Sequence, residues 1–198
     1  MNDNRSSGIL RRLCVAALLG LAACSGPAAP PPLQGARLGG PFSLVDQNGR
    51  AVKDSDFAGR YRLIYFGYSF CPDVCPTDLQ VIGRALKRFE EEAPQRAARV
   101  QPIFITVDPA RDTPDVLKSY VANFHPRLIG LTGSKEQIAE IMRAYGVSAM
   151  VPEGADPDYL VDHSQFAVLF GPQGEPIALM PEDQGVAAVA EALDQWVK

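Results

Sequence analysis

The residues best suited to chemistry are Cys71 and Cys75, which stand four positions apart and are each followed by proline. The apolar residues 63–66 before them predict a buried strand, and Pro76 with the periodic apolar residues after it predicts a helix. The two thiols therefore fall at a helix start, where unpaired N–H groups and the helix dipole favour an anion. We expect this position to lower the thiol pKa and to favour disulfide exchange or metal binding.

The four-residue spacing leaves both a disulfide and a metal site open. On a helical turn, side chains four positions apart carry Cβ atoms about 5–6 Å apart, whereas a relaxed disulfide has them about 3.8 Å apart. A small backbone adjustment would allow the disulfide, and the relaxed geometry could hold one soft metal ion between the sulfurs. The flanking Pro72 and Pro76 and the strand-to-helix position argue against a purely structural disulfide.

The chain has two histidines, and their surroundings predict different roles. His125 stands in the stretch Asn-Phe-His-Pro-Arg after a predicted helix, which is typical of a solvated loop residue. His163 follows a Pro-rich excursion at 150–159, longer than most connections and therefore a candidate for function. A lone histidine is more often structural, but its pairing with two cysteines at a helix start favours a functional site.

The amino-terminal segment, residues 1–23, is typical of an export signal. Three arginines precede an apolar run at 13–23, which is shorter than the roughly 20 residues that span a bilayer. The segment ends Leu-Ala-Ala-Cys24 and resembles a bacterial lipoprotein signal, in which that cysteine carries the lipid. We expect a lipid anchor on Cys24, a Pro-rich tether over residues 24–37, and a globular domain facing the periplasm or the cell exterior.

Composition limits the remaining possibilities. The chain has 198 residues with 19 basic and 23 acidic side chains, a net charge of −4, which gives no basic face for nucleic acid. Its 46% hydrophobic content is enough for one substantial core, which we place at residues 38–198. Once Cys14 is lost with the signal and Cys24 carries lipid, the two central cysteines remain as a pair in an oxidising compartment.

The order of the predicted elements indicates the fold class. Near-continuous apolar strands at 61–67 and 100–107 enclose a helix at 76–92, which is typical of a parallel strand–helix–strand unit. A hairpin with an Asn-Gly turn precedes this unit at 42–53. The further predicted elements are helices at 114–124, 134–145 and 186–197, a strand at 128–131 and a hairpin at 166–180. This order predicts an α/β fold, a thioredoxin-like mixed central sheet flanked by helices, with an N-terminal β-hairpin.

Asp108 directly follows the second strand of the parallel unit. Because the carboxyl ends of neighbouring parallel strands share one edge, Asp108 is expected on the same rim as the two cysteines. Thr113 or Asp112 is a candidate N-cap, with Pro114 as the first residue of the next helix. The stretch is therefore either a well-capped loop with an Arg–Asp surface pair or a layer of support around the thiols.

Three separated motifs resemble those of one protein family. They are Tyr-Phe-Gly-Tyr-Ser-Phe-Cys-Pro-Asp-Val-Cys-Pro at 65–76, Thr-Val-Asp-Pro-Ala-Arg-Asp-Thr-Pro at 106–114 and Val-Asp-His-Ser at 161–164. In this order they resemble the SCO/SenC family of copper proteins that assist cytochrome c oxidase assembly, across residues 38–197. The lipoprotein signal differs from the transmembrane anchor of many relatives in that family.

The resemblance implies membrane attachment and copper held by Cys71, Cys75 and His163. Two thiolates and one imidazole form a soft set suited to Cu(I), and a further ligand could accommodate Cu(II). A structural zinc site would want four ligands, and the domain offers only these three. Asp108 and Asp162 are expected around the ligands as supporting residues.

The resemblance also implies the function. It predicts a membrane-anchored chaperone that delivers copper to the binuclear copper site of a cytochrome c oxidase subunit. The alternative is a thiol:disulfide oxidoreductase that reduces the partner's copper-ligand cysteines, so that another copper chaperone or a thiol reductase would be a further partner. Copper and a disulfide exclude each other at the same sulfurs. A peroxidase fits poorly, because Ile64 and Tyr68 stand where peroxiredoxins carry proline and threonine.

Overall fold

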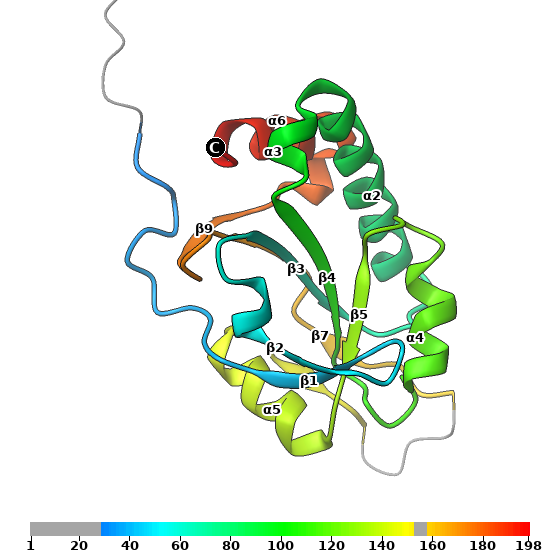
Figure 1. The fold of residues 1–198 in the computed structure, drawn as a ribbon. Helices are drawn as coiled ribbons and strands as arrows, with labels where there is room; N and C mark the ends of the chain where they lie inside the picture. The colour runs from blue at the N-terminus through cyan, green and yellow to red at the C-terminus, as the bar shows by residue number, and fades with distance from the viewer. Residues whose placement is uncertain (1–28, 153–157) are drawn as a thin grey trace, which may run out of the picture. The chain divides into compact units, whose positions relative to one another are not determined.

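A mixed sheet forms the centre of the computed structural model, which describes residues 29–152 and 158–198. The sheet lies in the unit Pro31–Lys198, and its seven strands follow the order β2-β1-β5-β4-β3-β8-β9 (Figure 1). The strands are β1 Ser43–Asp46, β2 Ala51–Lys53, β3 Tyr61–Gly67, β4 Val100–Thr106, β5 Ile129–Thr132, β8 Ala167–Phe170 and β9 Pro176–Leu179. Strands β3, β4 and β5 are parallel to one another, and the other pairings are antiparallel.

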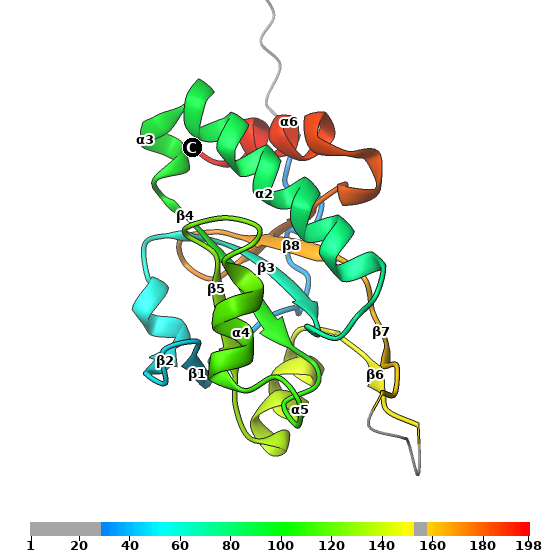
Figure 2. The same cartoon turned by 90° about the vertical axis from the view of Figure 1, so that its right-hand side faces the viewer.

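Helices cover both faces of this sheet (Figures 1 and 2). They are α2 Val74–Glu92, α3 Pro94–Ala97, α4 Pro114–Val121, α5 Lys135–Ala144 and α6 Val186–Trp196, with short 3-10 turns η1 Asp54–Phe57 and η2 Glu182–Gln184. Helices α2, α4 and α6 lie on one face, and α5 lies on the other. Because β3 and β4 are covered on both sides, every residue of these strands is buried, as their continuous apolar runs predict.

The structure confirms the predicted order of elements, including the edge hairpin β1–β2, in which Gly49 has φ 78° at the turn. Thr113 is the N-cap of α4, and Ser134 with Gln137 forms a capping box at the start of α5. None of the helices among the described residues is long and apolar enough to cross a membrane. The predicted signal and Cys24 lie outside the described residues, and the chain already meets the sheet at Leu33, whose N–H donates to Ile177 O at 3.0 Å.

Two local features differ from the sequence prediction. Helix α2 begins at Val74 rather than at Pro76, so that Cys75 belongs to its first turn and Cys71 stays in the bend before it. A small antiparallel ribbon also forms outside the main sheet, from β6 Ala149–Met150 and β7 Asp162–His163. Two residues per strand are too few to show an alternating pattern, so no periodicity in the sequence could reveal this ribbon.

His125 is a correction to the sequence prediction, because it is buried rather than solvated. Its side chain packs beside α2, with Nε2 3.4 Å from a carboxylate oxygen of Glu90. Its Nδ1 accepts a hydrogen bond from the Arg127 N–H at 3.2 Å. Burial lowers the pKa of His125, so the residue holds this corner of the fold together as a neutral imidazole.

A buried carboxyl group makes stability depend on pH. Glu182 accepts a hydrogen bond from the Ala167 N–H at 2.8 Å, and burial raises its pKa to about 7. The folded chain therefore holds this proton more tightly than the unfolded chain, and the associated stability is lost as pH rises from about 4.5 through about 7. We expect Glu182→Gln to be more stable than wild type at about pH 8, with a free energy of unfolding higher by on the order of 1–3 kcal/mol. Its urea midpoint should be correspondingly higher.

A comparison of wild type with Glu182→Gln at acidic pH isolates this effect. The amide introduced by Glu182→Gln keeps an acceptor oxygen for the Ala167 N–H, so near pH 4.5 the two proteins should unfold at similar urea concentrations. Equal stability of wild type and variant at both pH values, measured by urea unfolding, would show that Glu182 does not carry the dependence.

Candidate metal-binding site

Cys75 and His163 meet although 88 positions separate them in the chain. The Cys75 Sγ lies 3.4 Å from the His163 Nε2, and both side chains are buried. The ribbon β6–β7 delivers the histidine, since His163 pairs with Ala149 across it. His163 Nδ1 lies 2.7 Å from the Ser164 carbonyl oxygen, which can only accept. Nδ1 therefore carries the proton, and the lone pair of Nε2 points toward the sulfur, as a metal ligand requires.

Cys71 lies at the entrance to this pair. It is partly exposed in the bend before α2, and its sulfur accepts a hydrogen bond from the Cys75 N–H at 3.5 Å. Both thiols are free. Within the described part of the chain, no three histidine, cysteine, aspartate or glutamate side chains are already gathered as a metal site. Cys71, Cys75 and His163 would therefore have to draw closer together to share one ion.

The expected lowering of the thiol pKa is wrong for Cys75. Burial raises its pKa to about 12, with a further contribution from the neighbouring Cys71. The helix start does favour a thiolate, but removal from water costs the anion more than the helix offers. Cys75 is consequently a protonated thiol in the reduced protein, and a metal that binds there must displace a proton.

Gly67, the last residue of β3, leaves room for the Cys75 sulfur. A Cβ at this position would lie 3.0 Å from the Cys75 Sγ, 3.0 Å from the Tyr65 ring and 3.1 Å from the Phe104 ring. These distances are shorter than ordinary carbon contacts, so a side chain here must displace its neighbours.

We expect Gly67→Ala to destabilise the fold by about 1–3 kcal/mol through overpacking and also to weaken metal binding, because the sulfur is among the displaced atoms. Gly130→Ala is the matched control. Its Cβ would meet Val121 and Leu117 at 3.0 and 3.1 Å, away from the sulfurs. Urea unfolding should show a loss of stability in both variants, whereas a metal titration should show weaker binding only for Gly67→Ala. Unchanged metal affinity in Gly67→Ala would contradict this view of the glycine.

Asp112 holds the bend that leads to Cys71. Its buried carboxylate accepts hydrogen bonds from the Ser69 N–H at 3.1 Å and from the Thr106 hydroxyl at 2.6 Å, and it also contacts the Ser69 hydroxyl. The sequence pattern indicated either a helix cap for Asp112 or, for its stretch as a whole, a layer of support around the thiols, and the cap is Thr113. The sequence signal for its support of the cysteine bend was its place in the motif at 106–114, which follows β4, the parallel neighbour of β3.

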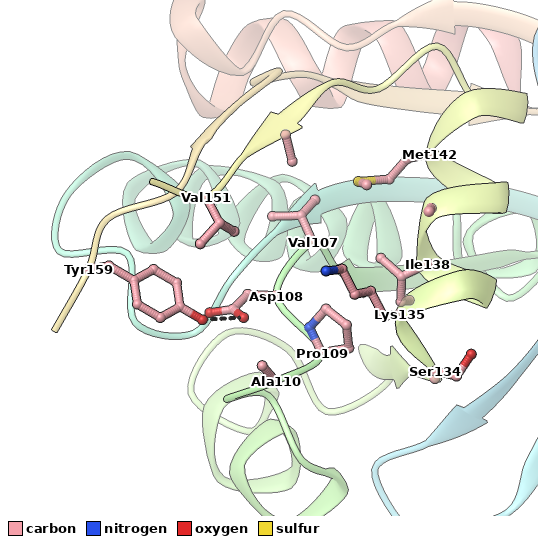
Figure 3. A pocket seen from close by; sticks show the side chains of 13 residues that line it. Val107, Asp108, Pro109, Ala110, Ser134, Lys135, Ile138, Met142, Val151 and Tyr159 are labelled. Carbon is pink, nitrogen blue, oxygen red and sulfur yellow. Dashed lines mark hydrogen bonds between the residues drawn. The ribbon is translucent and has the colours of Figure 1, made fainter. Parts of the chain in front are cut away.

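Asp108 lies on the predicted rim, but its ion pair is buried rather than on the surface. One of its oxygens accepts a hydrogen bond from the Arg111 Nε at 2.5 Å, and the other accepts one from the Tyr159 hydroxyl at 2.8 Å. Figure 3 shows this second bond at the edge of a hollow of 620 Å³ between the end of β4, α5 and β6. Residues 153–157 of the predicted excursion lie outside the described residues. Asp162 is exposed on β7, opposite Met150.

Exposed apolar side chains lie in the segments that carry the site, and two of them, Met150 and Leu160, line one hollow with Cys71 and His163. Of the five large apolar side chains that are exposed among the described residues, four belong to the segments beside Cys71 and His163. They are Phe70, Met150, Val151 and Leu160. Such a cluster in water is typical of a surface that contacts another molecule.

The fold and the cysteine turn place this chain in the thioredoxin-like class. The thioredoxin domain of a thiol-disulfide oxidoreductase from Bacteroides vulgatus has a TM-score of 0.56 at 14% identity, covering 81% of this chain and 96% of that one. At this identity the likeness concerns the fold alone.

The family follows from closer matches. The family model described as SCO1/SenC matches residues 30–198, and the chain belongs to this family. "Protein SCO2, mitochondrial" of Saccharomyces cerevisiae is 39% identical over 166 residues, which cover 81% of this chain and 54% of that protein. The chain thus spans about half the length of this curated relative.

Two solved structures of relatives concern bound copper and a disulfide switch. Bradyrhizobium japonicum ScoI, solved with copper bound, has a TM-score of 0.72 at 39% identity, covering 80% of this chain and 99% of that one. BsSco has a TM-score of 0.61 at 25% identity, covering 80% and 94%. It is described as having a disulfide switch and as a member of the Sco family of cytochrome c oxidase assembly proteins.

Proposed function

We propose that this chain is a copper-binding assembly protein that delivers copper to the binuclear copper site of a cytochrome c oxidase subunit. Cys71, Cys75 and His163 are the proposed ligands. The observation that carries the proposal is the 3.4 Å approach of the His163 Nε2 to the Cys75 Sγ. Relatives with bound copper and the family's link to oxidase assembly support it.

The donor set suits copper as a cargo. Two sulfurs and one imidazole nitrogen are soft donors that match Cu(I), and a further oxygen or nitrogen ligand would extend the set for Cu(II). Cys75 and His163 form the buried side, whereas Cys71 lies nearer to solvent. Because Cys71 is the accessible donor, it would be the first to receive copper and the last to release it to a partner.

A metal titration tests the proposal. Reduced protein titrated with Cu(I) without oxygen should bind one equivalent tightly, and protein oxidised to the Cys71–Cys75 disulfide should bind none at this site. Equal copper binding by reduced and oxidised protein would remove the cysteines from the proposal. A thiol count before and after loading verifies the redox state of each sample.

A thiol:disulfide oxidoreductase is the second candidate, favoured by the asymmetry of the pair. Cys71 is accessible and Cys75 is buried, as expected for an attacking thiol and a resolving thiol. In this role the protein would reduce the copper-ligand cysteines of its partner, and a thiol reductase would restore it. Copper-free protein should then reduce a partner disulfide stoichiometrically, and the reaction should survive His163→Ala but not Cys71→Ser.

The apolar cluster Phe70, Met150, Val151 and Leu160 supports a protein partner for either role. Such a surface around the site entrance would exclude water while copper or electrons pass between two proteins. Candidate partners are the oxidase subunit and another copper chaperone. The composition offers no basic face for nucleic acid.

We also propose that residues 1–23 are a lipoprotein signal and that lipid on Cys24 anchors the domain to a membrane of the bacterial envelope. Because Leu33 already pairs with the sheet, residues 24–30 rather than 24–37 would then space the unit Pro31–Lys198 from that membrane. Mass spectrometry of the protein expressed in bacteria should find a diacylglyceryl group on Cys24, and Cys24→Ser should release the protein from membranes. An intact amino terminus on the exported protein would contradict the assignment.

A further inference from the structure

The guanidinium group of Arg111 lies at the point where two segments of the site meet. Its side chain is only 14% exposed, and Nε donates to the buried Asp108 carboxylate at 2.5 Å. The Cζ atom lies 3.5 Å from the centre of the Tyr159 ring, 4.9 Å from the Phe70 ring and 5.6 Å from the Tyr68 ring. A cation so placed is attracted by each ring face, and more strongly where water is excluded.

These rings come from the two segments that carry the ligands. Tyr68 and Phe70 belong to the bend that ends in Cys71, whereas Tyr159 precedes His163 by four positions. The Tyr159 hydroxyl donates to the same Asp108 carboxylate that receives Arg111, as Figure 3 shows for the Asp108–Tyr159 pair. One cation and one carboxylate after β4 therefore join the cysteine bend to the histidine segment.

A second connection leads from the same bend to the histidine. The Tyr68 hydroxyl accepts a hydrogen bond from the Val161 N–H at 3.2 Å. The His163 and Tyr68 rings also meet edge to face, with centres 5.7 Å apart. Movement of the histidine segment away from Arg111 would therefore also break the contacts that orient the imidazole.

We propose that Arg111 is a positioning residue, which with Asp108 and Tyr159 forms a latch that holds His163 against the cysteine pair. The inference rests on the proposed copper site. Arg111 acts on the ligands through the Tyr159 and Tyr68 rings, which its guanidinium contacts. This flat group fits between a carboxylate and aromatic faces, which the ammonium group of lysine does not reproduce.

The test compares the copper complexes of full-chain variants. Arg111→Ala should bind Cu(I) about 10- to 100-fold more weakly than wild type in competition with a Cu(I) chelator, as is common for residues that orient a metal ligand. Its Cu(II) complex should show reduced splitting from the imidazole nitrogen in electron paramagnetic resonance. Added imidazole should restore most of the lost affinity, because it supplies the nitrogen donor that the displaced His163 no longer provides. Arg111→Lys should fall between wild type and Arg111→Ala.

Arg127→Ala is the matched control. Arg127 is also a partly buried arginine paired with a carboxylate, at 2.5 Å from Glu90, and this pair lies away from both ligand segments. The variant should lower the melting temperature and leave the Cu(II) spectrum unchanged. If Arg111→Ala does not fold, Tyr159→Phe removes only the hydroxyl bond to Asp108 and should change the spectrum in the same direction by a smaller amount.

The outcomes separate the latch from the copper site itself. A wild-type copper affinity and spectrum in Arg111→Ala would overturn the latch while the copper site stands. Lost affinity that imidazole does not restore and that Arg127→Ala shares would overturn the latch as well. A wild-type complex without an imidazole nitrogen signal would overturn the proposed site first.

Discussion

Replacing His163 by alanine is expected to weaken the binding of Cu(I) to the reduced protein by about 100-fold or more. The imidazole Nε2 is the nitrogen donor beside the Cys75 sulfur, at 3.4 Å, and its proton is fixed on the other ring nitrogen by Ser164 O. Loss of a residue that merely orients a ligand costs about 10- to 100-fold in metal affinity, and loss of the ligand itself should cost at least as much. Competition with a chromophoric Cu(I) chelator under nitrogen measures the change.

The other histidine of the chain provides the control. His125 is buried as well, and its removal leaves Glu90 and the Arg127 N–H without this partner. His125→Ala should therefore lose stability yet keep the copper affinity of wild type. Wild-type affinity in His163→Ala would remove the histidine from the ligand set. Equal losses in both variants would indicate a damaged fold rather than a missing donor.

The meeting of Cys75 and His163 was expected from the family resemblance, and strand order gives its physical reason. The cysteine turn follows β3, and the strand after His163, β8, pairs with β3 in the antiparallel direction. The end of β3 and the start of β8 therefore lie at one edge of the sheet, whatever the details of the loops. Long apolar runs identify both strands, and such runs are the most dependable signal in a sequence.

The thiol pKa could not be predicted in the same way. The helix start is visible in the sequence and favours a thiolate, but the burial of Cys75 depends on residues that pack over it from elsewhere in the fold. Tyr65 and Gly67 of β3 lie against the sulfur side of α2 and leave no space for water. Desolvation of the thiolate costs more free energy than the helix start provides. Tertiary burial therefore determines that the pKa of Cys75 is raised rather than lowered.

Polar residues produced the remaining errors for a related reason. His125, Arg111 and Asp112 stand in polar loop sequences. His125 and Asp112 are buried and Arg111 is partly buried, each by partners that the local sequence does not reveal. Asp112 contacts Ser69, which is 43 positions away in the chain, and His125, which follows α4, contacts Glu90 of α2. A local pattern treats such residues as solvated, although a buried charge or imidazole needs only well-placed partners to remain inside.

Replacing Asp112 by alanine is expected to destabilise the fold by about 2–4 kcal/mol, because the partly buried Ser69 N–H and the buried Thr106 hydroxyl would lose their acceptor. The bend before Cys71 should loosen at the same time, so that Cys71 reacts faster with an alkylating reagent. Urea unfolding of reduced protein measures the first effect, and the rate of thiol alkylation followed by mass spectrometry measures the second.

A double-mutant cycle with Thr106→Val assigns the loss to these hydrogen bonds. Valine has the shape of threonine without the hydroxyl, so the cycle reports the coupling between the two side chains. We expect the double variant to be more stable than the sum of the single losses predicts, since no hydroxyl is then left without its acceptor. Asp112→Asn, which keeps one acceptor oxygen, should cost less than Asp112→Ala. Stability of Asp112→Ala within about 0.5 kcal/mol of wild type, the range of ordinary surface changes, would show that the carboxylate does not hold the bend.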